Sequence, residues 1–180
     1  MYLIKKTLTH PKACKDERPI FQEKIKTYEA AGFPIVYSDK SGFAHEMPRT
    51  HGYAPIGKRC FGIKDWHAKG RTNVIAALVD KLLLTVALFD TYIKADIFYA
   101  WVRQDLLPKL KKRCVIVLDN ATFHKRQDRQ DALRKAGHIL LFLPPYSPDL
   151  NKIEPQWAQD KTLRKQNHRS INELFTQYIL

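Results

Sequence analysis

The stretch CVIVLD, residues 114–119, is apolar up to its last residue, which is an aspartate. Such a short apolar run is typical of a strand that is buried on both faces of a sheet. The run FPIVYS at 33–38 has the same character and precedes Asp39, after which KSGF is expected to break the strand. If these two strands are parallel neighbours, Asp39 and Asp119 face each other about 5 Å apart, at the edge where open α/β sheets bind ligands.

Three further runs predict the remaining strands. NVIAALV at 73–79 and LLLTVALF at 82–89 flank Asp80 and Lys81 and predict a hairpin, and HILLFL at 138–143 predicts the last strand. Together with the two buried strands these make five.

Apolar residues at helical spacing predict helices over 20–31 and 95–110. A basic helix is expected over about 126–136, where Gly137 stops it, and a further helix over about 151–168, after the proline-rich turn. Ser170 and Glu173 form a capping box that opens a final short helix. Because strands come first and then alternate with helices, the order indicates an α/β fold with a mixed five-stranded sheet and helices on both faces.

The composition indicates one basic domain. With 180 residues, 44% of them hydrophobic, the chain is long enough for a single domain with a core. Residues 1–16 are expected to form a basic arm and residues 17–180 the domain. The 31 lysines and arginines exceed the 18 acidic residues and give a net charge of +13, which favours a polyanionic partner, since each neutralised phosphate releases counterions. A basic surface that serves only solubility is the alternative.

Cysteine usage and hydropathy indicate an intracellular protein. Cys14, Cys60 and Cys114 are far apart and contain no CxxC pair, which favours a reducing, cytosolic setting without a zinc site. No apolar segment is long enough to cross a membrane, and the first residues lack the apolar stretch of a signal peptide. We therefore predict a cytoplasmic protein with no membrane partner.

A third carboxylate follows a stiffened turn. In LPPYSPDLNKIEPQW, residues 143–157, three prolines precede Glu154. Proline fixes its own φ and biases the residue before it toward extended geometry. The turn is therefore expected to be rigid and to bring the next helix back over the strand ends, with Glu154 at its start.

Asp39, Asp119 and Glu154 together predict a metal site. Three carboxylates at one place repel each other unless a cation neutralises them, and an all-oxygen site favours Mg²⁺ or Mn²⁺ over zinc. Two such ions can activate a water or hydroxyl on one side of a phosphodiester and stabilise the leaving oxygen on the other. On a basic protein such a site would cut or join nucleic acid.

Each of these residues also has a structural interpretation. Asp39 and Asp119 are ordinary turn formers at strand ends, and Asn151 with Glu154 fits a helix capping pair. His124 could reach the site or lie in a solvated loop. We expect Trp157 to pack in the core rather than to contact DNA.

Three blocks of the sequence resemble a known family. YSDKSGF, VLDNATFHK and LPPYSPDLNKIEPQW are similar to the three catalytic blocks of DDE transposases of the mariner superfamily, in particular its bacterial insertion-sequence branch. Asp119 and Glu154 are separated by 34 residues, as in that branch. RTHGYAPIGKR and GRTNVIAALVD also resemble the family's linking segments, so the similarity runs from about residue 5 to 175.

The resemblance implies a ribonuclease H-like fold in which Asp39, Asp119 and Glu154 bind two Mg²⁺ or Mn²⁺ ions. It implies hydrolysis at transposon ends, followed by attack of the freed 3′-hydroxyl on target DNA, commonly at a TA dinucleotide, with no covalent nucleophile on the protein. The implied partner is double-stranded DNA, from transposon ends and target, bound by a homodimer in the active complex. The implied location is the bacterial cytoplasm, in association with the nucleoid.

The sequence departs from the family in three ways. Lys40 stands where glutamate is common and could compete with a cation or contact a phosphate, and Lys152 replaces a usual proline. The family's helix-turn-helix DNA-binding module is expected to lie outside this chain, on a separate or missing segment. These departures keep two alternatives open: an inactive, domesticated DNA-binding or regulatory protein, and a structure-selective nuclease on the same fold.

Overall fold

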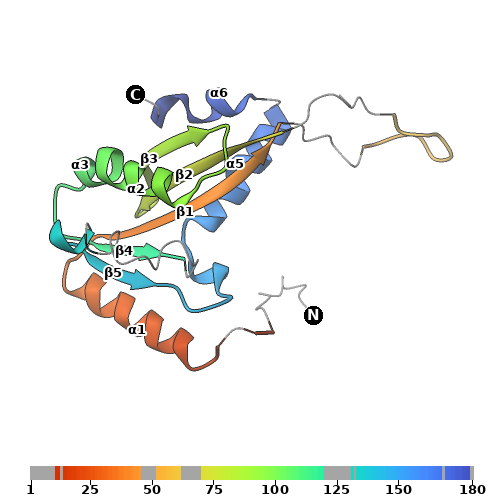
Figure 1. Ribbon diagram of the computed structural model, residues 1–180. Coiled ribbons are helices and arrows are strands. Elements are labelled where there is room, and N and C mark those ends of the chain that lie inside the picture. The colour runs from red at the N-terminus through yellow and green to blue at the C-terminus, as the bar shows by residue number, and fades with distance from the viewer. Residues whose placement is uncertain are drawn as a thin grey trace.

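The computed structural model describes residues 11–12, 14–45, 52–61, 70–119, 131, 133–167 and 169–178. The elements, shown in Figure 1, are α1 (Glu17–Ala30), β1 (Ile35–Ala44), β2 (Arg71–Val79), β3 (Leu82–Phe89), α2 (Ala95–Trp101), η1 (Val102–Leu106), α3 (Leu107–Lys109), β4 (Val115–Leu118), β5 (Ile139–Phe142), η3 (Pro148–Leu150), α5 (Glu154–Asn167), α6 (Ile171–Phe175) and η4 (Thr176–Tyr178). None of the helices in these ranges is long and apolar enough to cross a membrane.

The five strands form one mixed sheet in the order β3-β2-β1-β4-β5 (Figure 1). β1 pairs antiparallel with β2, and β2 with β3, whereas β4 is parallel to both β1 and β5. The predicted mixed sheet is therefore confirmed, and so is the prediction that the two apolar strands ending near aspartates are parallel neighbours.

The predicted end of the first strand is wrong. β1 does not break at KSGF but continues to Ala44, because its antiparallel pairing with β2 runs from Val36 to Ala44. Its parallel pairing with β4 covers only residues 35–38. Asp39 thus lies inside a long strand, at the point where β1 loses one of its two neighbours.

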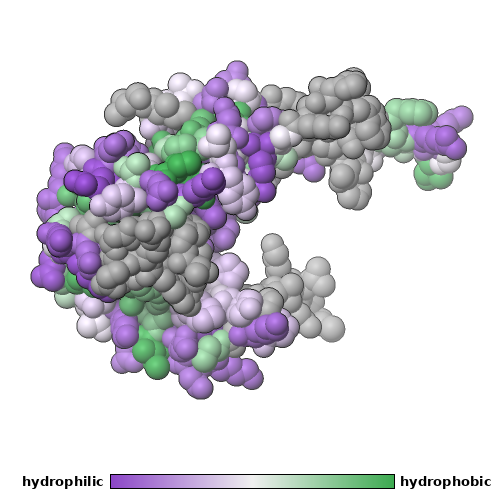
Figure 2. Space-filling view, viewed as in Figure 1, coloured by the Kyte–Doolittle hydropathy of each residue, from purple (hydrophilic) through white to green (hydrophobic). Residues whose placement is uncertain are grey.

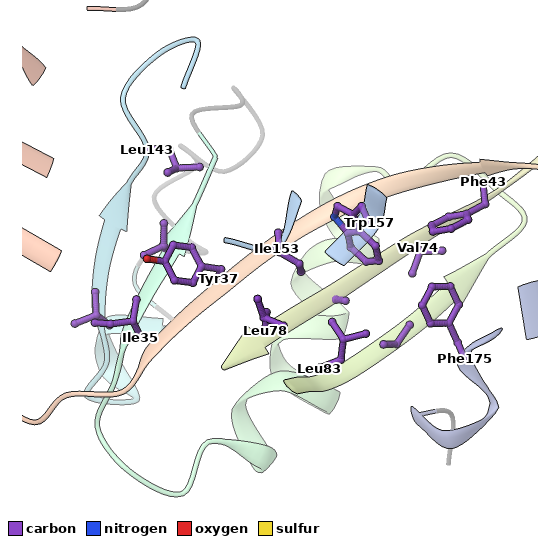
Figure 3. Packing of buried hydrophobic residues seen from close by; sticks show 14 of the residues in the cluster. Ile35, Tyr37, Phe43, Val74, Leu78, Leu83, Leu143, Ile153, Trp157 and Phe175 are labelled. Carbon is purple, nitrogen blue, oxygen red and sulfur yellow. The ribbon is translucent and has the colours of Figure 1, made fainter. Parts of the chain in front are cut away.

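Helices cover both faces of the sheet, as predicted. On one face α1, α5 and α6 pack against alternate strand residues, and Figure 3 shows Trp157 and Phe175 beside Phe43. On the other face Phe98 of α2 and Leu106 of η1 pack against the opposite set of strand residues. The outer surface of the described residues is largely hydrophilic in the view of Figure 2.

Two predicted helix ends are formed by local capping. At the C-terminus of α1 the N–H groups of Gly32 and Phe33 donate to the carbonyls of Glu29 and Tyr28, both at 3.0 Å, with Gly32 at φ +78°. This is the left-handed end that glycine favours. At the start of α6 the predicted capping box is confirmed, with Ser170 and Glu173 exchanging both hydrogen bonds.

Some predictions concern residues outside the described ranges. Most of the expected helix over 126–136 lies there, as does most of the expected basic arm, and His124 does as well. The helix predicted over 95–110 is confirmed as a continuous helical stretch whose middle, η1, has π geometry.

Candidate active site

The register of the two parallel strands brings Asp39 and Asp119 to the same edge. Ser38 pairs with Leu118 as the last pair between β1 and β4, so the next residue on each strand is an aspartate. Asp119 directly follows β4, and Asp39 continues in β1. The sequence therefore places two carboxylates side by side through strand pairing alone.

Asp39 is buried and its carboxylate is held from two sides. Its side chain is 7% exposed, and the indole Nε1 of Trp157 donates to its Oδ2 at 3.2 Å. Burial raises the pKa of Asp39 to about 7; a hydrogen bond from the backbone of Lys40 opposes the rise, and the charges of Glu154 and Asp119 add to it. The carboxylates of Asp119 and Glu154 are thus both close enough to Asp39 to disfavour its charged form.

The raised pKa of Asp39 predicts a distinctive pH dependence of stability. Its folded pKa of about 7 exceeds the ordinary 3.8, so between these values the native state holds a proton that the unfolded chain has released. In the absence of metal this contribution to stability is complete below about pH 4 and is lost as the pH rises through 7. Urea unfolding in EDTA at pH 5 and 8 should show the loss in the wild type, on the order of a few kcal/mol, and a much smaller one in Asp39→Asn. Equal pH dependence in both proteins would contradict the assignment.

The proline-rich turn places Glu154 at the same edge. Leu143 donates to the carbonyl of Leu118 at 2.9 Å, which continues the strand pairing, and Ser147 Oγ donates to the carbonyl of Pro145 at 3.2 Å. Ile153 is fully buried and anchors the start of α5, whose first residue is Glu154. The predicted return of the helix to the strand ends is confirmed.

The capping-pair interpretation of Glu154 is wrong. α5 begins at Glu154 itself, and Asn151 donates its backbone N–H to the carbonyl of Pro148 at 2.9 Å rather than to Glu154. Oδ1 of Asn151 is buried and accepts no hydrogen bond from any described residue. The carboxylate of Glu154 is therefore not part of a capping box.

Asp39, Asp119 and Glu154 line one cavity of about 450 Å³ together with residues 143–148. Within the described ranges, no three His, Cys, Asp or Glu side chains are already gathered tightly enough to enclose a metal ion. The donor set itself, three carboxylates with no nitrogen or sulfur, fits a hard cation such as Mg²⁺ or Mn²⁺.

A larger cavity, of about 550 Å³, lies elsewhere, between the ends of α5 and β2. Arg164, Lys165 and Arg169 line it with a single carboxylate, Asp90. Because one carboxylate among three cations cannot hold a divalent ion in the way that three carboxylates can, we assign the chemistry to the smaller cavity.

Trp157 is the residue whose role the sequence did not reveal. As predicted, it packs in the core, with its ring 6.0 Å from that of Phe43 in an edge-to-face contact. It also hydrogen-bonds Asp39. Its spacing from Glu154 could have indicated this role. Glu154 is three residues before it, and residues three apart lie on the same side of a helix.

The two lysines that depart from the family pattern do not line the carboxylate cavity. Side chains alternate across a strand, and the ammonium of Lys40 lies 5.8 Å from the ring centroid of Tyr92, on the face opposite Asp39. Lys152 pairs with Glu29 at 3.1 Å and ties the turn before α5 to α1. Competition between Lys40 and a bound cation is therefore not supported by its position.

Comparisons with solved structures support this fold. A Mos1 mariner paired-end complex with Mg matches with a TM-score of 0.73 at 16% identity, covering 98% of this chain and 57% of that one. The Mos1 strand transfer complex matches with a TM-score of 0.72 at 17% identity, covering 99% and 56%. The catalytic domain of Mos1 transposase matches with a TM-score of 0.60 at 15% identity, covering 97% and 82%. The predicted ribonuclease H-like fold is thereby confirmed.

The chain spans just over half the length of the Mos1 transposase chains in the DNA complexes. No curated protein matches it. The model of the DDE superfamily endonuclease family matches residues 34–175, a range that contains the buried sheet, the proline-rich turn and all three carboxylates. This chain therefore belongs to the DDE superfamily endonucleases.

Proposed function

We propose that this chain is the catalytic domain of a DNA transposase of the mariner superfamily, from its bacterial insertion-sequence branch. The observation that carries the proposal is the cavity lined by Asp39, Asp119 and Glu154 in a chain of the DDE family. The reaction is hydrolysis of DNA at transposon ends, followed by transfer of the 3′-hydroxyl into target DNA.

The three carboxylates hold the metal. When bound, two Mg²⁺ or Mn²⁺ ions would activate the attacking oxygen and stabilise the leaving one. Burial of Asp39 and its hydrogen bond from Trp157 fix the direction of one ligand. The rigid turn fixes Glu154, so the donors are aimed by the fold rather than by flexible loops.

The partners follow from the same proposal. Double-stranded DNA, from both transposon ends and target, is the substrate, and the net charge of +13 favours binding to its phosphates. A homodimer forms the active complex, and a helix-turn-helix module that recognises the transposon ends is a further partner. The location is the bacterial cytoplasm, at the nucleoid. Mos1 structures with Mg, with Mn and with transposon-end DNA support the choice of metal and substrate.

One assay separates this function from its alternatives. The protein is incubated with supercoiled plasmid and a labelled duplex carrying a free 3′-hydroxyl, with EDTA, Mg²⁺ or Mn²⁺. Metal-dependent nicking together with label joined to the plasmid is the expected result. Nicking without joining would indicate a nuclease, and binding without either product would indicate the inactive regulatory protein.

A further inference from the structure

Beyond Asp39, one edge of β1 is not paired with any described strand, and at its far end Arg164 of α5 donates to the carbonyls of Ala44 and His45. The pairing of β1 with β4 ends at Ser38, whereas its pairing with β2 continues to Ala44. Among the described strands, none covers the other side of residues 39–44. On this part of β1, Lys40 and Gly42 are partly exposed beside the edge that also carries the carboxylates, whereas Asp39 and Phe43 on the other face are buried.

Arg71 lies over the strand on the face that carries Lys40. Gly42, two residues after Lys40 and on its side of the sheet, has no side chain, and the guanidinium of Arg71 occupies the space that a side chain there would need. Any residue larger than glycine at this position would displace it. The two cations thus follow one another along one face of β1, Lys40 at the residue after Asp39 and the Arg71 guanidinium beside Gly42.

Tyr92 is exposed beside Lys40, and its two neighbours in the chain are anchored. Its side chain is 72% exposed, and Lys40 Nζ lies 5.8 Å from its ring centroid. Asn73, the cross-strand partner of Gly42, donates to the carbonyl of Thr91 at 2.9 Å. On the other side Ile93 is 4% exposed and buried in the core. The backbone on both sides of Tyr92 is thus held, which keeps the exposed ring at this place on the surface.

We propose that Lys40, Arg71 and Tyr92 form a binding strip for an unpaired DNA strand that leaves the carboxylate cavity along β1. Phosphates contact the two cations, and a base packs on the tyrosine ring, the combination by which proteins hold single strands without reading sequence. The strip rests on the proposed function in taking DNA as its ligand. It gives Lys40 a role in strand binding instead of interference with metal.

The test measures binding without metal. Fluorescence anisotropy in EDTA compares a labelled oligothymidine of about 12 nucleotides with a blunt duplex of the same length, over a salt titration. Lys40→Gln and Arg71→Gln should each reduce the slope of log affinity against log salt on the single strand by about 0.7. Tyr92→Ala should weaken single-strand binding about tenfold and duplex binding much less, and Tyr92→Phe should retain it.

The matched control is Lys81→Gln. Lys81 is exposed in the turn between β2 and β3, at the opposite end of β2 from Asn73, the cross-strand partner of Gly42. Melting curves establish that each variant is folded. Two results would contradict the proposed binding strip. One is an unchanged single-strand affinity in Tyr92→Ala. The other is a salt slope of single-strand binding that falls as much in Lys81→Gln as in Lys40→Gln. Because no metal is present, this result is independent of whether the carboxylates catalyse cleavage.

Discussion

Asp119→Asn is expected to abolish metal-dependent DNA cleavage, by about a thousandfold or more, while leaving the metal-free protein as stable as the wild type or more stable. Loss of a metal ligand removes several kcal/mol of transition-state stabilisation. In the absence of metal, however, the charge of Asp119 contributes to the raised pKa of Asp39. Removing that charge at nearly constant shape relieves repulsion, a trade often found where function and stability conflict.

The same variant should lose most of the metal-induced rise in melting temperature. Ligands that bind only the folded state stabilise it in proportion to the logarithm of their concentration over Kd, so Mn²⁺ raises the Tm of the wild type and should raise that of Asp119→Asn far less. Glu154→Gln should behave alike, because glutamine preserves shape but removes the charge. Melting curves with EDTA and with Mn²⁺, read beside the plasmid assay, measure both effects.

Asp149→Asn is the matched control for these variants. Asp149 lies in the same turn as Pro148, but its carboxylate pairs with Arg18 at 2.6 Å and does not line the cavity. This variant should keep both cleavage and the metal-induced shift, at a stability cost of no more than about 1 kcal/mol for a partly exposed pair. Equal metal-induced shifts in all four proteins would end the assignment of Asp39, Asp119 and Glu154 as metal ligands.

The strands and the position of the carboxylates could be predicted because they depend on short-range patterns. The runs at 33–38 and 114–119 are apolar throughout, and such runs favour central parallel strands. The length of β1 could not be predicted in this way. Its extension through KSGF depends on hydrogen bonds to β2, some 30 residues further along the chain, and such pairing overrides the local turn signal of glycine.

The direction of the Lys40 side chain was the second feature that could not be predicted from the sequence. Period-two alternation places Lys40 and Asp39 on opposite faces once the strand is known to continue, but a strand that was expected to end at Asp39 gave no reason to apply it. The hydrogen bond from Trp157 to Asp39 joins residues 118 positions apart. It depends on how α5 packs on the sheet; the spacing from Glu154 places Trp157 on the side of the helix that faces the site but does not identify Asp39 as its partner.

Trp157→Ala should destabilise the protein by about 3–5 kcal/mol, a large part of the stability of a typical domain. The side chain is 1% exposed, and its ring contacts those of Phe43 and Phe175 at 6.0 and 6.4 Å between centroids. The core of this face surrounds it in Figure 3. Truncation leaves a cavity that these rings cannot fill, and urea unfolding measures the loss.

Trp157→Phe separates this packing role from the role at the site. Phenylalanine keeps an aromatic ring in the core but has no N–H to donate to Asp39, and the lost hydrogen bond favoured the ionised carboxylate. The pKa of Asp39 should therefore rise further above its wild-type value of about 7. Since metal binding requires the ionised form, Mn²⁺-induced stabilisation and cleavage should be weakened at pH 7 and largely restored near pH 9. A loss of metal binding that is the same at every pH would mean that Trp157 supports the site by packing alone.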